Sequence, residues 1–557
     1  MVPAENSASW RRDLLILGLL FAVLLGFRLG RAPLANPDEG RYAEIPREMV
    51  VSGDWVTPRL NGVNYFEKPP LMYWAVAACY QAFGPGEGSM RAVPVGFALG
   101  GVLLAYAAGR RLYGRWAGVA AAVVLGTSLI YFILGRVLLL DMAVSVLMSA
   151  ALFCFLLGVR EPAGARRRWL FYGLYASMAL ATLTKGLIGF LVPGAVMFLW
   201  LLVFNQWQRL RPLHLPTGAL LFLALALPWH VLAALHNPTW AHRYFVYEHW
   251  QRFTTTVAGR VEPWWYFGPI VVLGLFPWTG FLGPAVRAAT RGGWAARKQN
   301  ADAWFLLTWA GFVFLFFSVS GSKLIPYILP VFPPLAVLIG ASLVRVAAGT
   351  GRARAGLGVF SAGCGLLAVA LLVVVLKAGI IRDAWQAEAL RPFALALAAV
   401  LLAGGLFTPW FARRRGPGAA FGGIALTMAM FLALIATAMP HIQKPGTKEL
   451  ALYVKAHAAP GDRVVQYHDF FQDFLFYAQR DVEVTGTVSE LELEEDAAAR
   501  ASGRFYDEAE FRRRWEGPQR VWVVARRREV RELFADPTFH YHLLGEGRNH
   551  YLFSNRP

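Results

Sequence analysis

The chain is poor in charge and nearly free of cysteine. Only 16% of its 557 residues are Asp, Glu, Lys or Arg, while 57% are hydrophobic, and this balance excludes an ordinary soluble protein. Its three cysteines, Cys79, Cys154 and Cys364, all lie in apolar segments. We therefore expect no disulfide and no thiolate metal site in the loops outside the membrane. Repeats of a fixed period are also missing.

What the chain has in abundance is long apolar runs. A helix needs ~20 mostly apolar residues to cross a bilayer. The runs predict a polytopic α-helical membrane protein with about thirteen transmembrane helices. The predicted spans are 13–30, 89–108, 115–134, 138–158, 168–185, 187–205, 214–234, 265–285, 302–320, 324–345, 355–377, 391–411 and 418–440.

One apolar piece, residues 71–84, is too short to assign by length alone. Lys and Arg collect in the cytoplasmic loops of membrane proteins. If residues 71–84 do not cross, arginine clusters such as 110–115, 166–168 and 413–415 all fall inside. We therefore predict an interfacial or re-entrant helix at 71–84, an uncleaved first helix, an inner N-terminus and an outer C-terminus. The net charge of +19 then reflects topology and lipid headgroups, and no nucleic acid is expected as a partner.

Beyond Pro440 the composition becomes charged and mixed. Residues 441–557 are predicted to form a soluble α/β domain on the outer side, following a membrane domain of residues 1–440. The domain has neither a glycine-rich phosphate loop nor a nucleophile motif, so nucleotide binding has little support. The acidic run 490–500 is interpreted as a solvated helix face. Strands are expected at 463–468, 482–486, 520–525 and 540–545, and helices at 470–479, 510–516 and 529–535.

The first outer loop, residues 31–88, concentrates the candidate functional residues. Asp38 and Glu39 follow an apolar run and should lie at a membrane surface, where acidic groups usually have a function. Cations and aromatic rings near them could hold an anion beside a carboxylate, and phosphate is the obvious candidate. The residues of this loop are Arg41, Tyr42, Arg59, Tyr65, Phe66 and Lys68.

Other outer segments add to this set. Asp141 opens a later span on the same side as Asp38, although an aspartate there could simply cap a helix. The second large outer loop, 236–264, carries Arg243, His249 and Arg252. The segment SGSKLIPY carries Lys323, for which a snorkelling lysine is the alternative, and Tyr327.

Together these groups predict a cavity at the outer boundary of the membrane for an amphipathic lipid phosphate. Cations would stabilise charge on a leaving phosphate, and a carboxylate would orient or deprotonate the acceptor. A lipid transporter or flippase is the rival class. It should place ionisable residues deep in several helices, whereas the acids here gather on one face.

Several strings carry a family resemblance: RYAEIPREM, GDWVTP and YFEKPPL in the first outer loop, then EHWQRF and PWWYF near 248–267. They resemble the C-type (GT-C) glycosyltransferase superfamily, in the branch related to protein O-mannosyltransferases. Within it they are most similar to the bacterial 4-amino-4-deoxy-L-arabinose lipid A transferases. Gly40 departs from the pattern, since relatives tend to have a larger residue such as threonine there.

The resemblance implies a GT-C fold with an active site facing the periplasm of a Gram-negative inner membrane. It implies transfer of aminoarabinose from undecaprenyl phosphate to lipid A phosphates, which lowers negative charge and gives resistance to polymyxin and cationic peptides. No nucleotide sugar is involved, membrane lipids are the other partners, and a monomer is expected. A protein O-mannosyltransferase, or another polyprenyl-phosphate-sugar transferase with a different acceptor, is the alternative within enzymes.

The resemblance also suggests roles for residues. It makes Asp38 and Asp141 the catalytic pair. A lipid A phosphate is already anionic, with a second pKa near ~6, so Asp38 is predicted to position the acceptor rather than act as an obligatory base. Inverting displacement is expected, with Asp141 supporting the sugar. Lys68, Arg41, Arg243 and Arg252 would bind the donor phosphate, and Glu39, Tyr42, Arg59, Tyr65, Glu67, Lys323 and Tyr327 would line the cavity.

A divalent metal ion is a separate question. Glu67 and His249 could form a partial site, but two ligands far apart in sequence are weak evidence. Polar residues that are hydrogen-bonded without a metal are the alternative.

Overall fold

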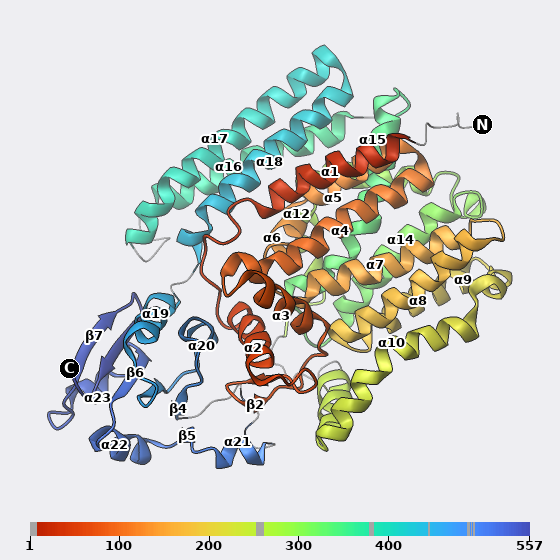
Figure 1. Cartoon of the computed structure of the whole chain (residues 1–557). Helices are drawn as coiled ribbons and strands as arrows, with labels where there is room; N and C mark the ends of the chain where they lie inside the picture. The colour runs from red at the N-terminus through yellow and green to blue at the C-terminus, as the bar shows by residue number, and fades with distance from the viewer. Residues whose placement is uncertain are drawn as a thin grey trace. The chain divides into compact units, whose positions relative to one another are not determined.

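The computed structural model describes residues 8–251, 261–351, 353–377, 384–443, 446–486, 491, 493 and 496–557. The chain forms two compact units, each assembled from separate stretches of sequence (Figure 1). The helical unit comprises Met1–Leu29, Arg91–His230 and Phe245–Ile442. The mixed unit comprises Gly30–Met90, Val231–Tyr244 and Gln443–Pro557. The first outer loop and the C-terminal region therefore belong to one unit, although more than 350 residues separate Met90 from Gln443 along the chain.

The helical unit consists of the apolar runs. Helices occupy each predicted span, but 115–134, 265–285 and 324–345 are each divided between two helical elements. In the described part of the chain, eight helices are long and apolar enough to cross a membrane, or up to nine if a bent pair is one span. The protein is thus a multi-pass membrane protein, and the predicted number of about thirteen crossings stays a prediction. The helices are α1 Ala8–Gly26, α4 Glu87–Tyr113, α5 Arg115–Thr127, α6 Leu129–Leu134, α7 Leu140–Gly158, α8 Ala165–Lys185, α9 Ile188–Val203, α10 Leu215–His236, α12 Phe267–Gly274, α13 Leu282–Ala289, α14 Ala301–Val319, α15 Phe332–Ala347, α16 Arg354–Leu376, α17 Ala384–Arg415 and α18 Pro417–Ile442.

One predicted span, 265–285, is wrong as a continuous helix. Two helical pieces, Phe267–Gly274 and Thr279–Ala289, meet at an angle of 102°. Pro277 lies in the break, and proline removes a backbone donor and obstructs the preceding turn of a helix. The next residue, Trp278, donates its indole N–H to Thr127 Oγ1 at 2.9 Å and so ties the bend to α5.

Polar contacts at the two ends of the helical unit fix the direction of its first helices. At one end Arg115 pairs with Asp13 at 2.7 Å. At the other end Arg136 donates to the carbonyl of Phe27 at 2.7 Å, and Arg91 donates to that of Leu29 at 3.2 Å. Helices α1 and α4 are therefore antiparallel, so the chain leaves α1 and enters α4 at the same end of the unit.

This geometry supports the prediction for residues 71–84. Helix α3, Leu71–Phe83, has 13 residues. At 1.5 Å per residue it is about 20 Å long, shorter than the ~30 Å hydrocarbon core of a bilayer. Because the chain leaves α1 and enters α4 at the same end of the helical unit, the connection that contains α3 does not need to cross the membrane.

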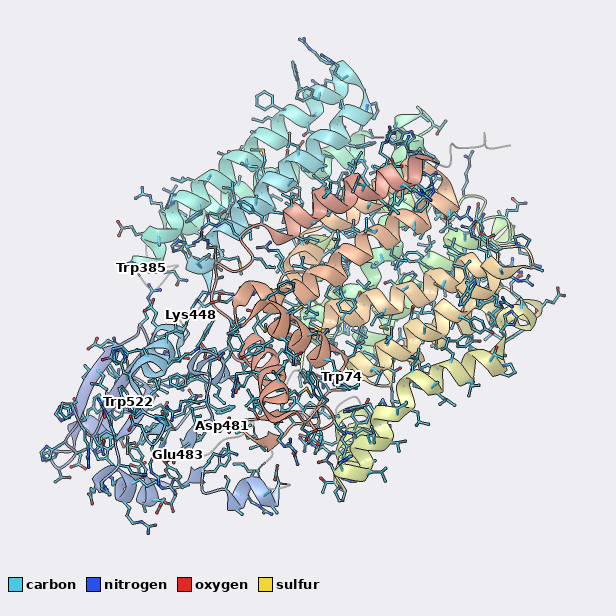
Figure 2. All side chains as sticks on the ribbon, in the orientation of Figure 1. Trp74, Trp385, Lys448, Asp481, Glu483 and Trp522 are labelled. Carbon is cyan, nitrogen blue, oxygen red and sulfur yellow. The ribbon has the colours of Figure 1, made fainter. Side chains whose placement is uncertain are left out.

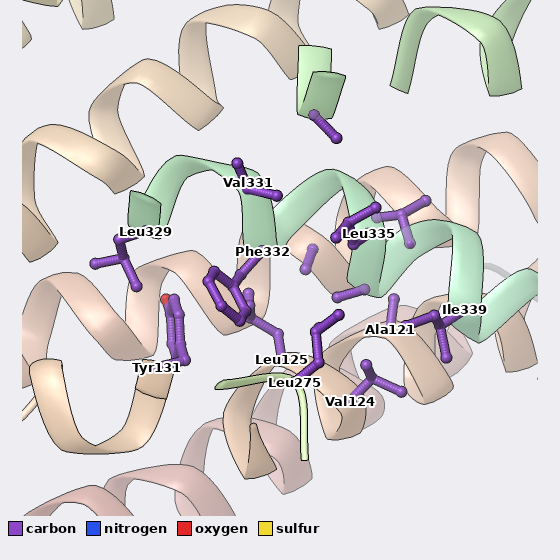
Figure 3. Packing of buried hydrophobic residues seen from close by; sticks show 14 of the residues in the cluster. Ala121, Val124, Leu125, Tyr131, Leu275, Leu329, Val331, Phe332, Leu335 and Ile339 are labelled. Atoms are coloured by element: carbon purple, nitrogen blue, oxygen red, sulfur yellow. The ribbon is translucent and has the colours of Figure 1, made fainter. Parts of the chain in front are cut away.

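The core of the helical unit is built by close helix packing (Figure 3). Phe332 of α15 is fully buried, as are Leu125 of α5 and Leu275. A Cβ on Gly340 of α15 would lie 2.6 Å from the backbone nitrogen of Ala121. The two helices thus approach at backbone distance, as small residues allow in membrane proteins.

The C-terminal part of the mixed unit forms the predicted α/β fold. Its sheet has the order β5-β4-β3-β6-β8-β7, with parallel pairing from β5 to β6 and antiparallel pairing from β6 to β7. All four predicted strands and all three predicted helices are confirmed, and β5 and β8 were not predicted. The elements are α19 Lys448–His457, β3 Arg463–Tyr467, α20 Gln472–Ala478, β4 Glu483–Thr485, α21 Ala497–Ala501, β5 Phe505–Tyr506, α22 Glu508–Glu516, β6 Val521–Arg526, α23 Arg531–Ala535, β7 His542–Glu546 and β8 His550–Ser554.

The acidic run 490–500 is only partly described. Residues 490, 492, 494 and 495 lie outside the described residues. Asp496 caps α21 by accepting from Ala499 N and also accepts from Asn64 N at 3.0 Å. This carboxylate is therefore a buried structural group and not part of a solvated face.

The first outer loop contributes the remaining elements of the mixed unit. They are α2 Asp38–Ser52, the two-stranded ribbon β1 Arg59–Leu60 and β2 Val63–Asn64, and α3. Asn61 and Gly62 both have positive φ, at 55° and 72°, as the tight turn of a short hairpin requires. Asn237, from the 231–244 stretch, donates to Thr57 Oγ1 at 3.0 Å and fastens that stretch to the loop.

Candidate functional site

In the mixed unit, Asp38 opens α2 beside a buried arginine. The side chain of Asp38 is 54% exposed, and its carboxylate lies 3.9 Å from Arg41, which is 11% exposed. Arg41 donates to the hydroxyl of Tyr65 at 3.0 Å, and its guanidinium carbon lies 5.7 Å from the Tyr65 ring centroid. The outcome is an accessible carboxylate next to a cation that is held in place by an aromatic ring.

The charges around Arg41 reinforce its ionised state. Burial opposes the charge of Arg41, but Tyr65, Tyr42, Glu67 and Asp38 raise its pKa above the ordinary value. Burial also raises the pKa of Tyr42 and Tyr65, so both phenols stay neutral at physiological pH. Arg41 is therefore a fixed cation beside two neutral phenols and the carboxylates of Asp38 and Glu67, and a guanidinium of this kind can pair with a phosphate oxygen.

Lys68 adds a second cation to this part of the loop. Its ammonium donates to the backbone carbonyl of Glu67 at 2.7 Å and lies 3.8 Å from the Glu67 carboxylate. The structure thus brings Asp38, Arg41, Tyr65, Glu67 and Lys68 together in one unit, with Tyr42 in electrostatic contact with Arg41 and Glu67. We call this group the loop-one cluster.

Two other candidates of the loop lie elsewhere. Glu39 is 1% exposed, and its carboxylate accepts from Ala35 N at 2.9 Å. This hydrogen bond fixes the turn that precedes α2. Arg59 pairs with Asp54 at 2.7 Å and lines a cavity of about 180 Å³ together with residues of α2.

In the helical unit, Asp141 is paired with a lysine. Asp141 lies in the first turn of α7, and Lys185 is the last residue of α8. The two side chains form an ion pair and are 13% and 12% exposed. The Lys185 ammonium also lies 4.4 Å from the ring centroid of Tyr327, one of the predicted cavity residues. A buried carboxylate, a cation and a phenol thus form the Asp141 cluster, and the helix-cap alternative does not account for the lysine and the ring.

Lys185 was not among the residues predicted for the site. It closes the short turn between two predicted spans and therefore looked like an ordinary helix end. The signal that could have found it was sidedness, because the alternation of spans places Lys185 and Asp141 on the same side of the membrane.

Lys323 has a different environment. It is 7% exposed, and its ammonium donates to the carbonyls of Ser320 at 2.7 Å and Glu262 at 2.9 Å. The ammonium is buried among backbone acceptors, which argues against the snorkelling interpretation. Lys323 fastens the segment that carries Tyr327.

The candidates of the second large outer loop are described only in part. Arg243 lies at the start of a π-helical stretch, His242–Gln251, and is half-buried. The side chain of His249 and the whole of Arg252 lie outside the described residues. Their predicted roles, including the metal pair of Glu67 and His249, stay predictions.

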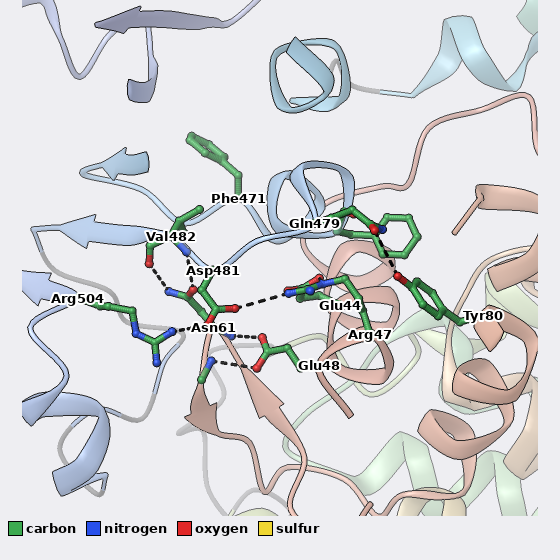
Figure 4. Close-up of polar contacts among 12 residues, drawn as sticks. Glu44, Arg47, Glu48, Asn61, Tyr80, Phe471, Gln479, Asp481, Val482 and Arg504 are labelled. Carbon is green, nitrogen blue, oxygen red and sulfur yellow. Dashed lines mark hydrogen bonds and ion pairs between the residues drawn. The ribbon is translucent and has the colours of Figure 1, made fainter. Parts of the chain in front are cut away.

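A group of three carboxylates, Glu44, Glu48 and Asp481, has oxygens within 4.8 Å of one another in the mixed unit (Figure 4). Each of the three carboxylates, including Asp481, which Figure 2 labels, already has a protein partner. Arg47 lies 2.6 Å from Glu44 and 3.6 Å from Asp481. Glu48 accepts from the backbone N–H of Gly62 at 3.0 Å. The cluster is therefore a network that holds the loop to the C-terminal region.

Comparison with known proteins places the chain in a class. The model of the dolichyl-phosphate-mannose-protein mannosyltransferase family matches residues 32–242. The crystal structure of ArnT from Cupriavidus metallidurans bound to undecaprenyl phosphate has a TM-score of 0.85 and 28% identity, with 99% of this chain and 98% of that chain covered. The apo form of the same protein has a TM-score of 0.82. The fold is that of a polytopic membrane glycosyltransferase of the C type.

Two curated relatives define the family more closely. Both are named undecaprenyl phosphate-alpha-4-amino-4-deoxy-L-arabinose arabinosyl transferase. The protein of Edwardsiella ictaluri is 33% identical over 376 residues, which is 67% of this chain and 66% of the relative. That of Aeromonas salmonicida is 36% identical over 367 residues, 64% of this chain and 65% of the relative. The chain belongs to this arabinosyl transferase family, as the motifs predicted, and the alignments span just under two thirds of these relatives' length.

Proposed function

We propose that the chain transfers 4-amino-4-deoxy-L-arabinose from undecaprenyl phosphate to lipid A phosphate groups on the periplasmic face of the inner membrane. The observation that carries the proposal is the match over nearly the whole length to the ArnT structure that binds undecaprenyl phosphate. The names of the curated relatives support the sugar and the donor lipid. The product has less negative charge, and resistance to polymyxin and cationic peptides follows from that.

The composition of the loop-one cluster supports a role in phosphate binding. In the proposed reaction, an oxygen of the lipid A phosphate attacks the anomeric carbon of the sugar. The bond from that carbon to the donor phosphate breaks, and undecaprenyl phosphate leaves with the bonding electrons. Negative charge grows on the leaving phosphate, and fixed cations stabilise it. Lys68 and Arg41 are assigned this task, together with Arg243 and Arg252.

The two aspartates are assigned to positioning. A phosphate acceptor is already an anion, so its attack needs no general base. Asp38 orients the acceptor and contacts the sugar's amino group, and its exposure leaves it free to do so. Asp141, with Lys185 and Tyr327, is assigned to supporting the sugar. No step is routed through a metal ion, and Glu67 with His249 remains the candidate pair for one.

The proposal is tested by mass spectrometry of lipid A from a Gram-negative strain with and without the gene. Addition of one aminopentose to a lipid A phosphate, dependent on the gene, is the expected result. The family model for protein mannosyltransferases makes an alternative acceptor the second candidate. Unchanged lipid A with newly glycosylated periplasmic proteins would contradict the proposal and favour that candidate.

A further inference from the structure

The residues just before Asp38 are held by a helix from the far end of the chain. Asn36 and Asp473 bond to each other twice: the Asn36 amide donates to the Asp473 carboxylate, and the backbone N–H of Asp473 donates to Asn36 Oδ1 at 2.9 Å. The two residues are separated by 437 positions in sequence and both belong to the mixed unit. Asn36 lies two residues before Asp38.

Asp473 is itself firmly fixed. It is 0% exposed, at the start of α20. Its carboxylate accepts from Thr447 N at 2.8 Å and from Thr447 Oγ1 at 2.9 Å, and Thr447 is also 0% exposed. A buried carboxylate with several donors is costly to disturb, because any donor left without its partner loses a full hydrogen bond. Asp473 is thus held in a fixed position, and its two hydrogen bonds with Asn36 fix the position of Asn36.

The fit between α20 and the start of α2 is tight, and Gly40 explains part of it. A Cβ on Gly40 would lie 2.5 Å from Asp473 N and 2.9 Å from the carbonyl carbon of Gln472. Only glycine lets the two helices approach this closely. Gly40, the residue that differs from the family pattern, therefore lies in the same contact as the Asn36–Asp473 pair.

The same contact extends to both sides of the Asn36–Asp38 segment. The hydroxyl of Tyr477, one turn further along α20, accepts from Leu34 N at 2.8 Å and donates to Glu87 at 3.0 Å. Lys448 forms an ion pair with Glu87. The first turn of α2 is closed by the backbone N–H of Glu39, which donates to Ala35 O at 3.0 Å. The C-terminal region therefore determines the path of the backbone that presents Asp38.

We propose that Asp473 is a positioning residue for Asp38, and that it acts through Asn36. The inference rests on the proposed function, since it assumes that Asp38 orients the acceptor. Asp473 contacts no reacting atom in this scheme. It restricts the backbone of residues 36–38, and small errors in the placement of a catalytic group cost large factors in rate. The C-terminal domain then serves the reaction by holding the catalytic loop.

The test uses the full-length protein in lipid nanodiscs and three variants. Asn36→Ala removes both bonds to Asp473 at an exposed residue, and we expect the variant to fold. The exchange Asn36→Asp with Asp473→Asn restores an amide-carboxylate pair with its direction reversed. Asn61→Ala is the control, and it is the harsher change because Asn61 is fully buried and has a positive φ. It too removes two reciprocal hydrogen bonds, both 2.9 Å, which join the first loop to Val482 of the C-terminal region. Asn61 lies 23 residues after Asp38, outside the segment that Asn36 holds.

Hydrogen exchange of the peptide covering residues 36–45 is the first readout, and it is independent of activity. Asn36→Ala is expected to exchange about tenfold faster than the wild type there, since a local bond network has been opened. The double variant Asn36→Asp with Asp473→Asn is expected to return the hydrogen-exchange rate of this peptide to near the wild-type value. Asn61→Ala is expected to leave that rate unchanged. Equal acceleration in Asn61→Ala, no acceleration in Asn36→Ala, or no rescue by the pair would overturn the inference.

Transfer kinetics are the second readout. Asn36→Ala is expected to lower kcat about tenfold and to change KM for the lipid-linked donor by less than about twofold. A change in KM alone would overturn the positioning role. If the wild type transfers no aminoarabinose, the proposed function fails, while hydrogen exchange still decides whether Asp473 holds the Asp38 segment.

Discussion

Asp141 and Lys185 form an ion pair at adjoining ends of the antiparallel helices α7 and α8. Both side chains are largely buried, and the Lys185 ammonium also lies over the ring of Tyr327. Two charges removed from water in this way are retained only where they compensate each other, because either one alone would be strongly destabilising. The pair therefore joins a predicted catalytic residue to a partner that motif reasoning had passed over.

Replacing Lys185 with methionine should lower transfer at least tenfold. The change leaves the Asp141 carboxylate without its counter-charge, and breaking a buried pair costs about 3–5 kcal/mol. Transfer of the sugar by the purified variant is the measurement, after size-exclusion chromatography has shown that the protein is folded.

The control for Lys185 is an ion pair at the opposite end of α7, where a residue just past that helix meets the first turn of α14. Arg160 pairs with Asp302, and the two side chains are 40% and 31% exposed. Exposed pairs contribute about 0–1 kcal/mol, so Arg160→Met should keep nearly full transfer. Equal losses in the two variants would contradict a specific role for Lys185.

Replacing Gly40 with alanine should destabilise the mixed unit by about 1–3 kcal/mol, the usual cost of overpacking. The new methyl group would meet backbone atoms of α20, which have little freedom to move. The midpoint of thermal unfolding is the measurement. Gly461 is the control, because a Cβ there meets nothing within 4 Å. A Gly40→Ala variant as stable as Gly461→Ala would show that α20 does not pack against α2 in this way.

Glu48 predicts a dependence of stability on pH. Burial raises the pKa of Glu48 from the ordinary 4.5 to about 8, and the neighbouring Glu44 adds to this. Between these two values the folded state holds a proton that the unfolded state has lost. The free energy of unfolding therefore falls as pH rises from about 4.5 to about 8. Glu48→Gln has no group at this position to titrate. The difference between its thermal unfolding midpoint and that of the wild type should therefore increase, in favour of the variant, as pH rises from 5 to 8.

Asp536→Asn is the control for the pH experiment. A hydrogen bond from Thr538 and the pair with Arg512 lower the pKa of Asp536 to about 2. The contribution of this group is lost only as pH falls below about 3.8, so the difference between Asp536→Asn and the wild type should stay constant from pH 5 to pH 8. A Glu48→Gln difference that is also constant would contradict the raised pKa.

Much of the helical unit could be predicted because its signals are local. Apolar length located the spans, and arginine placement assigned the 71–84 piece, whose helix proved to have only 13 residues. The bend after Gly274 was missed although Pro277 and Gly280 lay in view, since the hydropathy of a span does not register a break. In the C-terminal sheet, β8 was missed because its residues, HYLFS, are too few and too mixed for a clear alternation.

The loop-one cluster was predictable for a different reason. Asp38, Arg41, Tyr65 and Lys68 lie within one loop, so their proximity required only a compact local fold. Glu39, which was predicted to line the cavity because it follows Asp38, is only 1% exposed, and its role there stays a prediction. The Asn36–Asp473 pair carries no sequence signal, because neither residue belongs to a motif and their contact arises only when the chain folds back on itself.

The central claim is that Asp38 acts in the transfer of an aminopentose to a lipid A phosphate. It is tested most directly with purified protein, the undecaprenyl-phosphate-linked sugar and lipid A, by comparing the wild type with Asp38→Asn. The carboxylate is half exposed and lies 3.9 Å from Arg41, so the substitution should leave the fold intact. We expect the wild type to form lipid A that carries the aminopentose, and Asp38→Asn to form it at least ~100-fold more slowly. Full transfer by Asp38→Asn, or none by the wild type, would contradict this account.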